Sequence, residues 1–174
     1  MKIVPLSQAS LSFKVLISFF LVAVAVGYVF GLVHIYTDVG YSYTGIVTHY
    51  RGSEKELDVP PELAVAKLIH HQHVHIFGLS MLFLLIGIIF TLTQLSEPIK
   101  VVFVMAPYLG LLLDMSSFWL LVFKSAFFAW CAMAFGSFMA LAFFLILGRP
   151  FYEMWILPLW HQKWGEANVP KFLR

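Results

Sequence analysis

The sequence predicts an all-α fold, a four-helix bundle that spans a membrane, and three observations lead to this prediction. Of the 174 residues, 61% are hydrophobic and 11% are charged, whereas about 25% of residues are charged in an ordinary soluble domain. The mean hydropathy is +0.88. Four long stretches are free of charged residues or are broken only by Asp114. These observations exclude a free cytosolic enzyme, a disordered chain and a nucleic-acid partner, and they make the lipid bilayer the expected surroundings.

Each long stretch is a candidate membrane-spanning helix, because about 20 apolar residues are needed to cross the hydrocarbon core of a bilayer. The expected spans cover residues 13–36, 68–95, 100–122 and 125–148. The third span carries Asp114 and is apolar on both sides of it. We expect the whole chain, 1–174, to form a single integral membrane domain.

The segments outside the spans carry signals of their own. The only long connection runs from Asp38 to about Pro60. Pro61-Glu62 then favours a helix start, because proline fits the first helical turn and an acid meets the positive end of the helix dipole. The second helix should therefore run from Pro61 to Leu95, with its first turns extended above the membrane on the periplasmic side. The tail 149–174 holds tryptophans among basic residues, which is typical of an interfacial segment.

The distribution of basic residues predicts the orientation of the bundle. The side of the two termini carries Lys2, Lys14, Lys100, Arg149, Lys163, Lys171 and Arg174, and the other side carries Arg51, Lys55, Lys67 and Lys124. Cytoplasmic loops of membrane proteins are enriched in Lys and Arg. We therefore expect both termini in the cytoplasm, in a protein of the bacterial inner-membrane type.

Small residues recur every four positions in the fourth span, at Ala132, Gly136 and Ala140. In lipid, small residues at this spacing allow two helices to approach closely. The same span contains Cys131, which is the single cysteine of the chain. One cysteine forms no internal disulfide, and the chain has no Cys-x-x-Cys-His motif for covalent haem. The seven histidines are therefore the main source of cofactor ligands.

Four of the histidines are concentrated at the start of the second span, in the segment 70–78 (HHQHVHIFG). Successive residues of a helix are offset by about 100°. His71 and His75 therefore share one face of the helix, and Gly78 continues that face. A second pair of histidines from the same segment points in another direction.

That second pair is His70 and His73. His34 ends the first span on the same side of the membrane, and Asp114 lies in the outward half of the third span. All these groups are expected at one membrane level. A histidine cluster at a membrane surface can simply be solvated or contact a partner subunit, and this interpretation needs no cofactor. Polar groups that enter hydrocarbon are costly, however, and tend to mark ligands, proton paths or buried pairs.

In a first functional interpretation, His34 and either His71 or His75 supply the axial imidazoles of a b-type haem. A non-covalent haem needs ligands from two facing helices and room beside the backbone, which Gly78 would give. The segment resembles the histidine-rich helix starts of four-helix cytochrome b subunits. His73-x-His75 with the following apolar span is also similar to the haem-bearing segments of haem–copper oxidases and nitric oxide reductases. The resemblance covers residues 73 to about 90 and implies a haem-binding membrane subunit.

The number of haems is expected to be one. Of the histidines, only His161 lies toward the opposite membrane face, so no complete path for electrons across the membrane is expected. A second haem on the same side would need His70 and His73 as ligands; otherwise these two would support the first haem or contact a partner.

In a second functional interpretation, the histidines bind copper, zinc or iron directly. His71 and His75 can hold one metal from a single helix turn, with His34, His49 or Asp114 completing the shell. His70 and His73 are further candidate metal ligands. Imidazole suits all three metals, so the spacing does not choose between them.

Asp114 is costly in a membrane span, by about 2.5–3.5 kcal/mol on insertion scales. It can serve the fold, through a hydrogen bond to Ser116, Ser117 or a tyrosine that locks the bundle. It can also serve catalysis, as a proton acceptor beside the head group of a quinol, because quinol oxidation releases protons with its electrons.

These observations favour a membrane electron-transfer subunit that binds haem b near the periplasmic face. Such a subunit would take electrons from quinol and pass them to a periplasmic partner such as a c-type cytochrome, as the membrane part of a quinol-linked oxidoreductase with other subunits. The alternatives are a cofactor-free membrane anchor or assembly subunit, and a histidine-rich metal centre in a membrane oxidase.

Overall fold

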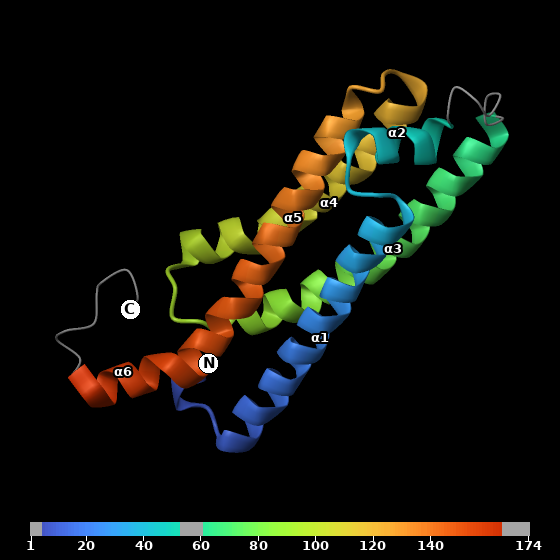
Figure 1. The fold of residues 1–174 in the computed structure, drawn as a ribbon. Coiled ribbons are helices and arrows are strands. Elements are labelled where there is room, and N and C mark those ends of the chain that lie inside the picture. Colours follow the sequence, from blue (N-terminus) through green and yellow to red (C-terminus); the bar gives the residue numbers. More distant parts are fainter. Residues whose placement is uncertain (1–4, 53–60, 165–174) are drawn as a thin grey trace.

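Four long helices form the membrane domain in a computed structural model that describes residues 5–52 and 61–164. They are α1 (Leu11–Asp38), α3 (Pro61–Thr91), α4 (Glu97–Phe123) and α5 (Phe128–Phe151), and they run roughly along one direction (Figure 1). Stretches long and apolar enough to cross a membrane lie at Leu11–Asp38, Leu68–Thr91, Glu97–Phe123 and Phe128–Trp160. The predicted all-α bundle with four spans is confirmed, and the described part of the chain contains no strand.

The helix ends differ from the expected bounds by a few residues. α1 begins after Ser10, whose side chain accepts a hydrogen bond from the Phe13 N–H. α3 begins at Pro61, ahead of its apolar span, as the sequence predicts. It ends at Thr91 instead of Leu95, because the following turn is closed by local hydrogen bonds such as Thr93 N–H to the Phe90 carbonyl.

The fourth helical segment is longer than expected. α5 continues through a π-helical turn, η2 (Tyr152–Ile156), into α6 (Leu157–Trp164), which points away from the bundle (Figure 1). The first part of the expected interfacial tail is therefore helical and continuous with the span, while residues 165–174 lie outside the described residues. A short 3-10 turn, η1 (Leu6–Gln8), precedes α1 and packs near η2.

A short helix, α2 (Tyr43–Arg51), lies in the long connection between α1 and α3. Ser42 starts it by accepting a hydrogen bond from the Gly45 N–H, and Gly52 ends it with a φ of 84° that favours glycine. α2 crosses the end of the bundle where α3 begins and α4 ends (Figure 1). It contacts α3, α4 and α5, and so covers that end.

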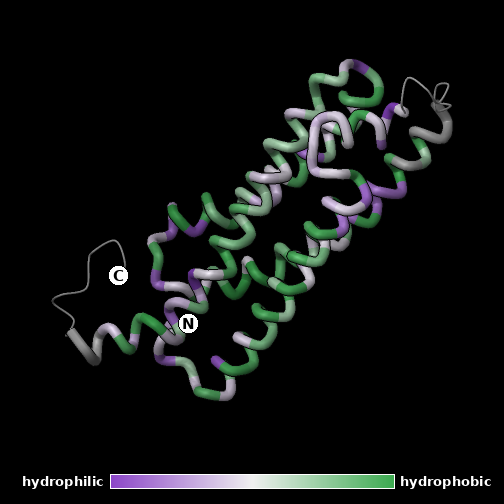
Figure 2. Tube along the Cα trace, viewed as in Figure 1, coloured by the Kyte–Doolittle hydropathy of each residue, from purple (hydrophilic) through white to green (hydrophobic). Residues whose placement is uncertain are grey.

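The core lies between α3, α4 and α5, and α1 stands apart. α4 and α5 share the most extensive contact, where Gly110 faces Met139. In contrast, only 6% of the apolar stretch of α1 is buried by the protein, and α1 contacts mainly α5. Hydrophobic residues cover the sides of the helices and hydrophilic ones gather toward the two ends (Figure 2). This distribution agrees with an integral membrane protein whose sides face lipid.

A buried ion pair joins the end of α5 to the turn after α3. Glu153 is fully buried, and its carboxylate accepts hydrogen bonds from the Gln94 N–H at 2.9 and 3.0 Å. Arg149 donates to the same carboxylate from Nε and Nη2, both at 2.9 Å. This cluster lies at the end of the bundle opposite α2, where α1 also begins (Figure 1).

Candidate functional site

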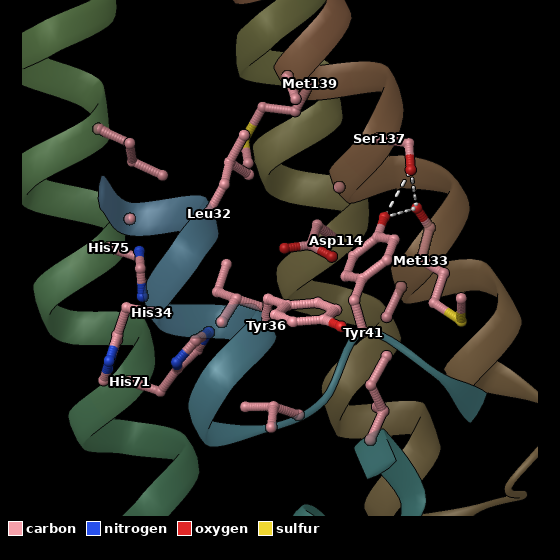
Figure 3. A pocket seen from close by; sticks show the side chains of 18 of the residues that line it. Leu32, His34, Tyr36, Tyr41, His71, His75, Asp114, Met133, Ser137 and Met139 are labelled. Atoms are coloured by element: carbon pink, nitrogen blue, oxygen red, sulfur yellow. Dashed lines mark hydrogen bonds between the residues drawn. The ribbon is translucent and has the colours of Figure 1, made fainter. Parts of the chain in front are cut away.

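A cavity of about 860 Å³ separates α1 from α3, α4 and α5, and α2 closes one end of it. Each of the five helices contributes lining residues, and most of the wall is apolar. The polar side chains gather toward the α2 end, where three histidines stand on one side and Tyr41 on the other (Figure 3). The cavity exists because α1 packs loosely against the other helices.

The structure brings the predicted haem ligands to this cavity. His71 and His75 of α3 line it together, with their ring centroids 4.2 Å apart. His34 of α1 lines it from the facing helix. A smaller adjoining cavity of about 320 Å³ is lined by His34, His71 and His75 together with His49 and His70. His49, which belongs to α2, reaches the cluster because that helix folds back over the bundle end.

Gly78 and His73 are not brought to either cavity. Gly78 is exposed, and a side chain at its position would meet nothing within 4 Å. Leu79 lines the cavity instead, one residue and about 100° further around the helix. The expectation that Gly78 makes room for a macrocycle therefore needs correction. His73 is exposed and packs edge-on against Phe77 at 5.1 Å.

Asp114 points into the cavity between the histidines and Tyr41 (Figure 3). Its residue surface is only 8% exposed, and no hydrogen bond joins its carboxylate to any residue that the structure describes. Ser116 and Ser117 donate instead to the carbonyls of Leu112 and Leu113, both at 2.7 Å. The predicted lock through these serines is thus replaced by bonds within α4. Gly136 of α5 lies directly against the carboxylate, since a Cβ there would be 3.5 Å from Oδ1.

The small residues of α5 face the cavity. Ala132, Gly136 and Ala140 line it, and a tight contact between α4 and α5 lies at another position, where Gly110 faces Met139. The small side chains therefore widen the space in front of Asp114.

Two tyrosines near Asp114 were not singled out as site residues by the sequence analysis. The Tyr41 hydroxyl donates to the Met133 carbonyl at 3.0 Å and lies 2.6 Å from the Ser137 hydroxyl. Tyr28 of α1 lines the same wall, and its ring stacks on Phe143 with centroids 4.0 Å apart. A polar side chain within an apolar span is a usable signal for such residues, and Tyr28 carried it.

Tyr50 of α2 packs over the histidines at the covered end. Its ring lies 4.6 Å from Phe118, and its hydroxyl is 3.5 Å from Nδ1 of His71. Burial raises the pKa of Tyr50 well above its usual value, and the negative charges of Asp114 and Asp38 raise it further. The hydroxyl therefore stays neutral beside His71.

The histidines do not form a ready ligand set for a bare metal ion. Within residues 5–52 and 61–164, no three His, Cys, Asp or Glu side chains come together in a way that could hold one. His73 lines neither cavity, and His70 lines only the smaller one. A haem needs only two axial imidazoles, so the arrangement is compatible with haem.

Comparison with family models identifies the family of this chain. Residues 40–160 match the model of a family described as a transmembrane helical domain, Aq_1264_TM. The match includes α2 to α5 with His71, His75 and Asp114, and it begins after α1 with His34. No curated protein and no solved structure matches the chain.

Proposed function

We propose that this chain, which belongs to the Aq_1264_TM family of transmembrane helical domains, is a membrane electron-transfer subunit that binds b-type haem in its cavity. The observation that carries the proposal is the meeting of His34 from α1 with His71 and His75 from α3 across a largely apolar space of about 860 Å³. Cofactor sites of about 300–1,000 Å³ with apolar walls and few polar groups are the usual kind.

The residues present fit a non-covalent haem. Its iron needs imidazoles from two facing helices, and α1 and α3 provide them. His34 and His75 are the favoured pair, because they line the cavity from the facing helices α1 and α3, while Nδ1 of His71 lies 3.5 Å from the Tyr50 hydroxyl. His71 is the alternative ligand on the same face. The described histidine side chains lie at the α2 end of the bundle, which favours a single haem layer.

When bound, the haem supplies a one-electron iron couple. The protein's own residues handle the proton. Asp114 faces the cavity without a hydrogen-bond partner among the described residues, so its carboxylate can accept a proton from a quinol hydroxyl. Oxidation of one quinol to quinone releases two electrons and two protons, so a one-electron partner would be reduced twice.

The partner is expected on the α2 side, because the histidines lie there. With both termini in the cytoplasm, this side faces the periplasm, where a c-type cytochrome or another redox subunit would accept the electrons. The exposed His70 and His73 belong to the same end and are candidate contacts for such a partner.

The test is a dithionite-reduced minus air-oxidised spectrum of the purified protein, with a pyridine haemochrome count. We expect a b-type α-band at about one haem per chain. His34→Ala and His75→Ala should each lose most of it, whereas His73→Ala, the matched control two residues away and outside the cavity, should keep it.

Two results would contradict the proposal. The first is a haem spectrum that survives both His34→Ala and His75→Ala. The second is a wild-type protein without haem; metal analysis would then separate a metal site from a cofactor-free anchor or assembly subunit.

A further inference from the structure

The inner part of the cavity, away from the histidines, has the features of a second binding compartment. Its walls come from Gly27 and Gly31 of α1, Leu79 and Leu82 of α3, and Met139 of α5. A Cβ added at either glycine would meet nothing within 4 Å. The two glycines are one turn apart, so they form a smooth strip of helix surface along an apolar space.

Asp114 is the polar end of this compartment. It is more than nine-tenths buried, it points into the space, and no described residue satisfies its carboxylate (Figure 3). A buried polar group without a partner is costly. Tyr41 is already engaged with Met133 and Ser137, and the described residues that line the cavity include no Lys or Arg. A ligand that enters the compartment and donates a hydrogen bond would therefore satisfy Asp114 in place of water.

The compartment borders the bilayer rather than the water. α2 covers the end of the cavity that lies at one end of the four spans. α1 is held to α5, for example by Tyr28 stacked on Phe143, but shares few contacts with α3. Gly27 and Gly31 line the cavity and are also exposed. The open side therefore lies between α1 and α3, where lipid tails would be.

We propose that the inner compartment binds the head group of a hydroquinone that carries an apolar tail, and that the molecule enters from the bilayer between α1 and α3. A hydroquinone O–H donates to the Asp114 carboxylate, and the tail leaves along Gly27 and Gly31. This deepens the proposed function and rests on it for the choice of a quinol. An anionic lipid head group is disfavoured, because it would meet the carboxylate without a cation.

The experiment measures equilibrium binding of a decyl-substituted benzoquinol to the full chain in lipid nanodiscs under anaerobic conditions. Gly31→Leu places a side chain in the compartment without a clash, so it should weaken binding at least tenfold. Gly148→Leu is the matched control, because Gly148 is also exposed in a helix with nothing within 4 Å but does not line the cavity. Asp114→Asn should weaken binding about tenfold, since it removes a charge-assisted hydrogen bond.

Two controls make the result decisive. Decanol should compete poorly; equal competition would mean that the space accepts any apolar tail, and it would overturn the assignment. Unchanged binding by Gly31→Leu would also overturn it.

The haem spectrum is recorded on the same samples. If the protein binds quinol but contains no haem, the quinol site is supported and the haem proposal fails. If it contains haem but does not bind quinol, the haem proposal is supported and the quinol site fails.

Discussion

Glu153 is an ionisable residue that the protein surrounds completely, and it shows how burial decides the value of a single ion pair. It pairs with Arg149 at 2.9 Å and accepts two more hydrogen bonds from the backbone of Gln94. Glu97 pairs with Lys100 at a similar distance of 3.0 Å, but its side chain is 82% exposed. The two pairs have nearly the same length and should differ greatly in their effect on stability.

We expect Glu153→Ala to lower the free energy of unfolding by about 3–5 kcal/mol, because it removes the fully buried carboxylate that accepts hydrogen bonds from the mostly buried Arg149 side chain and from a backbone N–H. Glu97→Ala is the matched control and should change it by less than about 1 kcal/mol, because water replaces an exposed partner. Chemical unfolding in mixed micelles measures both. Equal effects of the two substitutions would show that the Glu153 cluster does not hold the bundle together.

The polar residues of the site were only partly predictable from the sequence. The helical offset alone places His71 and His75 on one face, and chain reversal brings His34 to their level. The surroundings of Asp114 were not predictable, because Ser116 and Ser117 bond to their own helix. Tyr41 comes from the connection between α1 and α2, and the spacing of residues in the sequence does not predict its contact with Met133 and Ser137 of α5. Local geometry is therefore readable from the sequence, whereas contacts between distant segments depend on how the helices pack.

At the scale of helices, length and hydropathy sufficed for the four long elements and failed for α2. Four spans follow from apolar stretches that a membrane requires. α2 has only nine residues, and its apolar pattern is short. Only the flanking Ser42 and Gly52, which can start and end a helix, indicate it in the sequence. The rotation of each helix was not predictable either. This is why Gly78 was expected in the cavity and is found outside it.

The contact between α4 and α5 depends on a glycine that the sequence analysis did not single out. A Cβ at Gly110 would lie 2.8 Å from the Met139 Cβ and 3.1 Å from its Cα. Gly110→Ala should therefore push the helices apart and destabilise the protein by about 1–3 kcal/mol, as overpacking does. Unfolding in mixed micelles, or the thermal midpoint in detergent, provides the measurement.

Gly87→Ala is the control for this substitution. Its Cβ would meet only Val104 Cγ1, at 3.8 Å, which is an ordinary contact. Because alanine is the better helix former by up to about 1 kcal/mol, this variant should be neutral or slightly more stable. A Gly110→Ala protein as stable as Gly87→Ala would mean that the crossing of α4 and α5 is not closely packed.

At the scale of the whole molecule, the two ends of the bundle differ in chemistry. The histidines, Tyr50 and α2 occupy one end, and the Glu153 cluster and the start of α1 occupy the other (Figure 1). An even number of spans returns the chain to its starting side. The excess of basic residues predicts that this side is the cytoplasm.

Thiol labelling of intact cells with a permeabilised outer membrane tests the orientation, in a background in which Cys131 is replaced by Ala. Ser125 and Ser96 are both exposed and lie at opposite ends, after α4 and before it. A membrane-impermeant maleimide should label Ser125→Cys in intact cells and Ser96→Cys only after lysis. The opposite labelling pattern would place the histidine end in the cytoplasm and exclude a periplasmic electron acceptor.

The loose packing of α1 also affects the volume of the protein. Pressure favours whichever state eliminates internal void volume, and any part of the cavity of about 860 Å³ beside α1 that is left unfilled adds to that volume. A molecule that fills the cavity lowers the volume change on unfolding. Resistance of the folded protein to hydrostatic pressure should therefore follow the occupancy of the cavity, whatever the chemistry of the occupant.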